Sequence, residues 1–170
     1  NNIWLAWTEE MSLCWWVWFN DYRLAGYSRP WPATNVTYNP TTMMQSDYVS
    51  FSVRPSSWYN FAVWWRDIDY RWDVINSNVV PTELSWYFVC FTFLWAEGRF
   101  RIYIDWRLDQ EVYTWYTYID KAWDVWRFWC SHSWGYREDY GGMDGYIRDW
   151  AVYDRELSPQ EVSDFYNATL

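Results

Sequence analysis

Short segments in which apolar residues alternate with polar ones or run together recur along the chain, separated by turn residues. In the segment 99–105, Phe and Ile occupy every second position, and Arg or Tyr fills the positions between them. Because successive side chains of a strand point to opposite faces, this alternation predicts a strand with one face in the core and the other in water. The segment 86–94 is apolar at nearly every position, which predicts a central strand covered on both faces.

The number and spacing of such segments indicate the fold class. We expect strands near residues 3–7, 11–19, 47–54, 59–66, 70–75, 84–94, 99–105, 110–118, 125–131 and 143–154. Many short strands without alternating helical segments are typical of an all-β, antiparallel sandwich. The segment 22–44 contains several prolines and little alternation, and predicts a long surface loop of the kind that is often functional.

The last expected strand has an irregular apolar spacing. Ile147 and Trp150 are three positions apart, whereas Trp150 and Val152 are two apart. A strand with a strict period of two cannot keep all three on one face, so we expect a bulge near Arg148 and Asp149.

One short C-terminal helix is predicted after that strand. Ser158 is placed as the N-cap, Pro159 as the first helical residue and Glu161 as the third, which completes a capping box. Leu157 and Val162 occupy the two positions of a hydrophobic staple. The expected buried stripe of the helix consists of Val162, Phe165 and Tyr166.

Composition adds that the sandwich is unusually rich in aromatic rings. The chain has 19 Trp, 16 Tyr and 9 Phe, and 51% of its 170 residues are hydrophobic. That content rules out intrinsic disorder for most of the chain and permits a packed core. The length suits a single domain, residues 1–170. Residues 1–8, which contain the apolar run IWLAW, could form an N-terminal pairing strand.

The net charge of −9 narrows the range of partners. Nucleic-acid binders and proteins that dock on anionic membranes rely on basic surfaces, so neither class fits this chain. The longest apolar stretches, such as 13–19 and 86–94, are far shorter than the roughly 20 residues of a spanning helix, so we expect no membrane insertion.

Cysteines and sequons bear on the compartment. Cys14, Cys90 and Cys130 allow at most one internal disulfide, with one thiol left free or used between chains, and the sequence leaves the pairing open. Sequons occur at Asn35 and Asn167, which favours a secreted, glycosylated protein. Because the chain begins at Asn rather than Met, we expect a mature or truncated form.

Two blocks of the sequence resemble laminin G-like jelly-roll modules of the concanavalin A-like lectin and glucanase superfamily. The first is GGMDGYIRDWAVYDRELSPQEVSDFY, and the second is WYFVCFTFLWAEGRFRIYID. The positions that match the family pattern are Gly145, Ile147, Tyr153, Leu157, Ser158 and Glu161 in the first block, and Trp86, Val89, Phe91, Gly98, Tyr103 and Asp105 in the second. The segment DYVSFSVRP is compatible with an early strand of the same family.

The resemblance implies an all-β, antiparallel jelly-roll β-sandwich with one short C-terminal helix. The family usually has Gly after the residue matched by Asp105, because a tight hairpin turn needs positive φ. This chain has Trp106 there, so a turn of different construction is one expectation.

Calcium at the rim of the sandwich is also implied by the resemblance. Ca²⁺ takes carboxylate and carbonyl oxygens from irregular loops. Candidate ligands by loop position are Asp67, Asp69, Asp120, Asp124, Asp139 and Asp144, and our predicted metal set is Asp67, Asp69, Asp139 and Asp144. Ordinary solvated loop acids are the alternative explanation for these residues.

Catalytic residues are harder to find. Glucanase relatives place paired carboxylates on one strand, yet here Asp105 and Asp109 could share a face without any Glu to complete the set. The single histidine, His132, sits between two serines, and adjacent residues have the wrong geometry for a nucleophile and its base. We therefore predict no catalytic residues and no enzyme activity.

Exposed aromatic rings are the better candidates for ligand binding, because flat rings stack on sugar faces. The predicted ligand-binding residues are Trp31, Trp58, Trp72 and Trp106. Strand aromatics such as Trp86, Phe88, Phe91 and Phe100 are assigned to the core.

The leading hypothesis is a secreted, extracellular, non-enzymatic recognition or adhesion module that binds glycan or a protein partner at its loop edge. The alternative is a structural subunit of an extracellular fibre or coat, a homopolymer that forms by strand addition through residues 1–8 and by aromatic interfaces. A glycoside hydrolase is the third and least favoured hypothesis.

Overall fold

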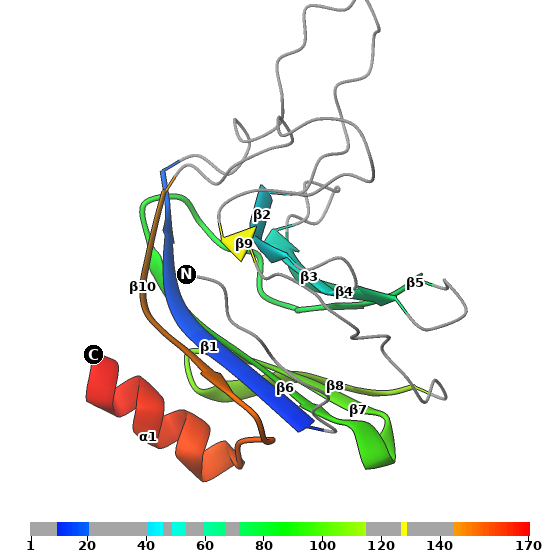
Figure 1. Ribbon diagram of the computed structural model, residues 1–170. Coiled ribbons are helices and arrows are strands. Elements are labelled where there is room, and N and C mark those ends of the chain that lie inside the picture. Colours follow the sequence, from blue (N-terminus) through cyan, green and yellow to red (C-terminus); the bar gives the residue numbers. More distant parts are fainter. Residues whose placement is uncertain are drawn as a thin grey trace, which may run out of the picture.

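Two antiparallel five-stranded sheets packed face to face form the protein (Figure 1). The computed structural model describes residues 10–20, 41–45, 49–53, 60–66, 72–114, 127–128 and 145–170. Sheet A has the order β10 (Gly145–Tyr153), β1 (Glu10–Phe19), β6 (Trp86–Leu94), β7 (Arg99–Ile104) and β8 (Arg107–Tyr113). Sheet B has the order β5 (Trp72–Asn76), β4 (Phe61–Arg66), β3 (Val49–Val53), β2 (Thr41–Gln45) and β9 (Arg127–Phe128).

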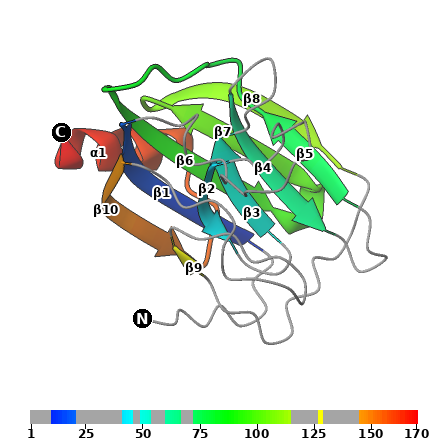
Figure 2. The same ribbon diagram turned by 90° about the horizontal axis from the view of Figure 1, so that it is seen from above.

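The predicted antiparallel sandwich with one short C-terminal helix is confirmed. A 3₁₀ turn, η1 (Trp95–Glu97), joins β6 to β7, and the helix α1 spans Pro159–Thr169. The chain passes repeatedly between the sheets, because β1, β6–β8 and β10 belong to sheet A while β2–β5 and β9 belong to sheet B (Figure 2). The expected strand at 3–7 lies outside the described residues.

Two expected boundaries were wrong. The predicted loop at 22–44 extends too far, because Thr41 begins β2, which pairs with β3 from Thr41 opposite Val53. The chain resumes an extended ladder directly after Pro40, and the rest of that segment lies outside the description. The strand expected from residue 110 starts at Arg107, because the preceding turn occupies only two residues and returns the chain to β7 at once.

The core lies between the two sheets. Alternate residues of β1, β6 and β7 meet residues of β4 and β5 there. The buried members are Met11, Leu13, Trp15, Val17, Phe19, Phe61, Val63, Ile75, Val89, Phe91, Phe93, Phe100, Ile102 and Ile104. The period of two in the sequence therefore places one face of each of these strands in the core, as predicted.

A second cluster covers the outer face of sheet A. Helix α1 lies across this face (Figure 1), and the buried residues beneath it are Cys14, Trp16, Phe88, Cys90, Tyr103, Leu157 and Val162. Strand β6 is therefore central in its sheet and covered on both faces, which confirms the prediction from its sequence. The second face of β7 was expected to be wet throughout, and this was wrong: Tyr103 is buried, because the helix covers it.

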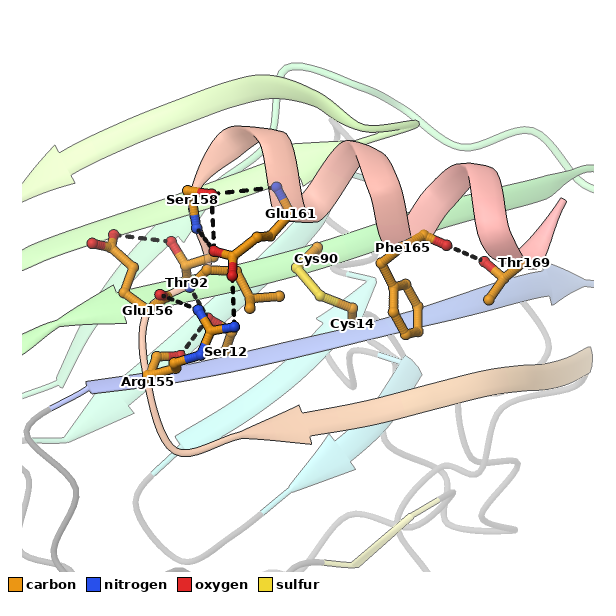
Figure 3. Close-up of a disulfide and its surroundings, with 11 residues drawn as sticks. Ser12, Cys14, Cys90, Thr92, Arg155, Glu156, Ser158, Glu161, Phe165 and Thr169 are labelled. Atoms are coloured by element: carbon orange, nitrogen blue, oxygen red, sulfur yellow. Dashed lines mark hydrogen bonds and ion pairs between the residues drawn. A yellow bond between two sulfur atoms is a disulfide. The ribbon is translucent and has the colours of Figure 1, made fainter.

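A disulfide joins the two central strands of this covered face. Cys14 and Cys90 are directly opposite each other in the β1–β6 register, and their sulfur atoms are bonded (Figure 3). This settles the pairing that the sequence left open, and Cys130 lies outside the described residues.

The helix starts as the sequence predicts and is anchored to β1. The Ser158 hydroxyl accepts from the Glu161 amide at 3.3 Å, while the Glu161 carboxylate accepts from the Ser158 amide at 2.8 Å. Just before the cap, the buried Ser12 hydroxyl donates to the Arg155 carbonyl at 2.9 Å and accepts from the Leu157 amide at 2.8 Å (Figure 3). Leu157 and Val162, the two staple residues, are both buried, so the entry to α1 is fixed by packing and by hydrogen bonds.

The predicted bulge in the last strand is confirmed. In the β1–β10 ladder, Cys14 pairs with Ala151 and Trp16 with Arg148, so two β10 residues oppose Trp15 alone. Asp149, one of the two, has a φ of +49°. Asp tolerates this conformation better than most residues, and the bulge lets β10 keep apolar residues on the core side on both sides of it.

Candidate functional site

The β7–β8 hairpin carries the one predicted ligand-binding tryptophan whose side chain the structure describes. Asp105 and Trp106 form its turn, with φ values of +48° and +65°, and Ile104 pairs with Arg107 on either side of them. Positive φ at both central residues is the hallmark of the type I′ turn, whose twist matches that of the strands. The expectation of a differently constructed turn was therefore wrong: the strand geometry imposes the same turn even with Trp in place of Gly.

Asp105 fixes this turn against the neighbouring strand. Its amide donates to the Phe88 carbonyl at 2.9 Å, and its carboxylate accepts from the Phe88 amide at 3.0 Å. The two bonds continue the β6–β7 ladder past its last pair, Val89 and Ile104. The position of Trp106 is thus set by a hydrogen-bonded neighbour rather than by a free loop.

Trp106 presents its ring at the surface of this anchored turn. The residue remains 41% exposed, and the Arg107 guanidinium carbon lies 5.2 Å from the ring centroid. A cation at this distance from an indole is weakly attracted by the ring and restricts its motion. The pair offers a flat apolar surface beside hydrogen-bond donors, which is the combination that binds a sugar ring or a polar peptide.

The acidic residues next to the turn serve the fold. Asp109 accepts from the Asn78 amide at 2.8 Å, and it lies at the irregularity in the β7–β8 register. Burial raises the pKa of the Asp109 carboxyl, and the hydrogen bond from Asn78 lowers it in part. The carboxylates of Asp105 and Asp109 thus each accept a hydrogen bond from a backbone amide of a different segment.

A charged cluster at the other end of sheet A anchors the segment before the helix. The Arg99 guanidinium lies 2.6 Å from the Glu156 carboxylate, and Arg101 lies 3.3 Å from the same carboxylate. Thr92 also donates to Glu156, at 3.2 Å. Arg101 lowers the pKa of the Glu111 carboxyl by hydrogen bonding. The charges of this cluster are paired with one another, and the pairs to Glu156 hold the segment before the helix against β7.

The remaining predicted ligand-binding and metal residues are not brought together by the described structure. Trp72 is the first residue of β5, in sheet B, whereas Trp106 belongs to sheet A. Outside the described residues lie Trp31, Trp58, Asp67, Asp69, Asp120, Asp124, His132, Asp139, Asp144 and Asn35.

Asn167, the second predicted glycosylation residue, is exposed on α1. Its side-chain amide lies 3.5 Å from the Ser163 hydroxyl. The hydroxyl of Thr169, which completes the sequon, donates to the Phe165 carbonyl at 2.9 Å and accepts from the Trp16 indole at 2.8 Å. Glycosylation at Asn167 stays a prediction.

One aromatic residue assigned to the core is at the surface instead. Trp86, the first residue of β6, is 41% exposed. Strand β7 ends at Ile104, and the chain turns at Asp105, which is bonded to Phe88. Trp86 therefore lies beyond the end of β7. The run of apolar residues in β6 gave no sign of this, because exposure at a strand end depends on where the neighbouring strands stop.

The described residues contain neither a group of side chains that could hold a metal ion nor a helix that could cross a membrane. Within the described ranges, no three His, Cys, Asp or Glu residues are grouped so that they could hold a metal ion. The proposed calcium ligands lie elsewhere in the chain. No helix in the part of the chain that the structure describes has the length and apolar character needed to cross a membrane.

Comparison with solved structures finds the same sandwich in other proteins. A heptameric SAP-like pentraxin from Limulus polyphemus is 14% identical, with a TM-score of 0.63 over 92% of this chain and 69% of the pentraxin chain. The ligand-binding domain of botulinum neurotoxin serotype D, in complex with N-acetylneuraminic acid, is 17% identical, with a TM-score of 0.61 over 99% of this chain. The serotype G binding domain is also 17% identical, with a TM-score of 0.65 over 95%.

These likenesses establish the fold. This chain spans only 38% and 37% of the two toxin chains, respectively. No curated protein sequence matches the chain. A laminin G family profile described as the concanavalin A-like lectin/glucanases superfamily does match it, over residues 5–163. Profile and sandwich agree with the resemblance seen in the two sequence blocks, and the chain therefore belongs to the concanavalin A-like lectin/glucanases superfamily.

Proposed function

We propose that this protein is a secreted, non-enzymatic recognition module that binds glycan or a protein partner at its loop edge, with Trp106 as a contact residue. One observation carries the proposal: a bulky, exposed indole occupies a turn position whose φ of +65° favours glycine. Retaining Trp there costs stability, and nothing in the packing of the fold uses its exposed surface. Binding is a function that would justify the residue.

The acidic residues beside this turn support the absence of catalysis. The carboxylates of Asp105 and Asp109 accept hydrogen bonds from the amides of Phe88 and Asn78, so they shape the hairpin and its neighbouring segment. A glycoside hydrolase needs two carboxyl groups that face one cleft, whereas the carboxylates of this pair are engaged with backbone amides of two different segments.

The structural neighbours agree with a binding role. The serotype D toxin domain was solved in complex with N-acetylneuraminic acid, and the pentraxin is a heptamer. A sandwich of this kind thus forms part of a toxin chain that was solved with a sugar ligand, and it occurs in a pentraxin that is a heptamer. We extend only the binding role to this chain. The fibre hypothesis stays a prediction, since residues 1–8 lie outside the described ranges.

Calcium at the rim forms part of the same proposal. Asp67, Asp69, Asp139 and Asp144 supply the carboxylate oxygens that this ion prefers. Calcium bound there would neutralise part of the net charge of −9.

A glycan array and a panel of extracellular proteins test the proposal, each probed with wild type and Trp106→Ala, with and without EGTA. We expect at least tenfold weaker binding by the variant. Tyr113→Ala is the matched control, because Tyr113 is an exposed ring at the far end of the same strand. Equal binding by wild type and Trp106→Ala would contradict the role of Trp106, and release of reducing sugar from a bound glycan would contradict the non-enzymatic assignment.

A further inference from the structure

Three aromatic side chains lie side by side on the outer face of sheet A. Trp18 of β1 pairs with Tyr146 of β10 on one side and with Trp86 of β6 on the other. Residues that pair directly in antiparallel strands share a face, and neighbouring strands are about 4.8 Å apart, so the row is about 10 Å long. The ring centroids of Trp18 and Tyr146 are 5.4 Å apart. We call Tyr146, Trp18 and Trp86 the aromatic row.

The row lies just beyond the C-terminal end of α1. Trp18 shares its face with Trp16 and Cys14, because the three alternate along β1, and those two residues are buried under the helix. The last helical residue, Thr169, contacts Trp16 through a 2.8 Å hydrogen bond from the indole. The helix therefore covers the outer face up to Trp16 and leaves the next row open: Tyr146 is 61% and Trp86 is 41% exposed.

Arg148 packs against Trp86 of the aromatic row and against the neighbouring Trp16. Its guanidinium carbon lies 4.8 Å from the Trp16 ring and 5.0 Å from the Trp86 ring. Nη1 donates to the Thr169 carbonyl at 3.0 Å and to the Asp149 carboxylate at 2.8 Å. These contacts fix the plane of the guanidinium. A guanidinium has five N–H donors, and both of these hydrogen bonds use Nη1, so the donors on Nε and Nη2 are available to a ligand.

The size of the surface favours a small ligand. A Trp or Tyr side chain covers about 150–250 Å², so with 61% of Tyr146 and 41% of Trp86 exposed the exposed parts amount to roughly 150–250 Å². A stable protein interface needs about 800 Å² from each partner. The aromatic row is therefore too small to hold a second copy of the chain and is large enough for one or two sugar rings.

The charges favour a neutral ligand. Arg148 is balanced by Asp149 beside it, and the chain as a whole carries −9, so an anionic ligand gains nothing here. Asp149 lies in the β10 bulge. A bulge changes the direction in which the side chains of its strand point. Aromatic faces flanked by one donor group and one acceptor group match a ring with apolar faces and hydroxyls at its edge.

We propose that the aromatic row with Arg148 and Asp149 is a binding site for a neutral oligosaccharide of glucose-like pyranose rings. Equatorial hydroxyls leave both faces of such a ring free to stack on Tyr146 and Trp86, and the hydroxyls at its edge meet Arg148 and Asp149. This site stands on residues other than Trp106, which lies in the turn beside β6 at the same end of sheet A.

Isothermal titration calorimetry with cellohexaose tests the site in the full chain. Binding is expected for wild type, at least tenfold weaker binding for Trp86→Ala and for Tyr146→Ala, and near wild-type binding for Tyr146→Phe, which keeps the ring. Trp106→Ala should bind cellohexaose as wild type does, so this assay separates the two sites. Thermal unfolding checks that each variant is folded, and Trp86→Leu, which also lacks an aromatic ring, replaces Trp86→Ala if that variant does not fold.

Three results would overturn the proposal. The first is no binding of cellohexaose by folded wild type. The second is equal binding by wild type, Trp86→Ala and Tyr146→Ala. The third is a wild-type dimer in sedimentation that Tyr146→Ala abolishes, because the face would then be an interface between copies. Loss of binding in Trp106→Ala alone would assign the sugar to the loop edge instead.

Discussion

The turn at Trp106 makes a sharp prediction about backbone strain. Trp106→Ala and Trp106→Gly both remove the ring and its contact with Arg107, so the two variants differ only in how well they adopt a φ of +65°. The left-handed conformation costs an L-residue about 1–2 kcal/mol, and Gly is exempt. Gly in turn loses about 0.4–1 kcal/mol more in unfolded-chain entropy than Ala. The glycine variant should therefore be the more stable, by about 0.5–1 kcal/mol.

Urea unfolding measures this difference as a shift in midpoint at constant slope. In a domain of this size, 1 kcal/mol corresponds to a rise in Tm of about 2–4 °C. Tyr113 provides the control, because it is an exposed residue in the same strand with ordinary strand geometry: there Gly should be less stable than Ala. If Trp106→Gly were no more stable than Trp106→Ala, the turn would not impose positive φ in solution, and the case for a functional Trp would lose its basis.

Three further predictions concern the outer face. Hydrogen bonds from Arg155 and then from Ser158 lower the pKa of the Glu161 carboxyl from 4.5 to about 2. The ionised carboxylate therefore stabilises the fold fully above pH 4.5, and this stabilisation is lost as the pH falls toward 2. In urea unfolding across this range, wild type should lose its stability advantage over Glu161→Gln, and a constant difference between the two would contradict the prediction. Leu157→Ala should lower the free energy of unfolding by about 2–4 kcal/mol, because it opens a cavity under the helix. Gln160→Ala, at an exposed position of α1, should change the free energy of unfolding by less than about 0.5 kcal/mol. Similar losses in the two variants would refute the docked position of α1. Replacing both Cys14 and Cys90 by Ser should cost about 2–5 kcal/mol in non-reducing urea, because the bond closes a loop across 76 residues, and unchanged stability would mean that the disulfide does not form.

Local signals in the sequence were enough for the elements whose geometry is set locally. The capping box at Ser158 and Glu161 and the staple at Leu157 involve residues within five positions of one another, so their pattern could be recognised directly. The period of two in β7 likewise predicts which residues face the core. The bulge was visible because the spacing of apolar residues in β10 changes beside Asp149.

Features that depend on register between distant strands could not be predicted in this way. The Cys14–Cys90 pair requires knowing that β1 lies beside β6 with these two residues opposite each other. The exposure of Trp86 depends on the point at which β7 turns away and α1 ends. The aromatic row was missed for the same reason, since Trp18, Trp86 and Tyr146 come from three separate segments and only the sheet order makes them neighbours.

The two hydrogen bonds between Ser12 and the residues before α1 link positions 143 and 145 apart in the chain. The ribosome adds Ser12 to the chain long before it adds Leu157, so β1 and β6 are synthesised well ahead of the helix that covers them. Contacts over such long sequence separations form slowly, and apolar surface that stays exposed during this time is prone to aggregation. A nascent chain thus exposes Trp16 and Phe88 until α1 has emerged, which makes the docking of that helix the step that covers this face of sheet A.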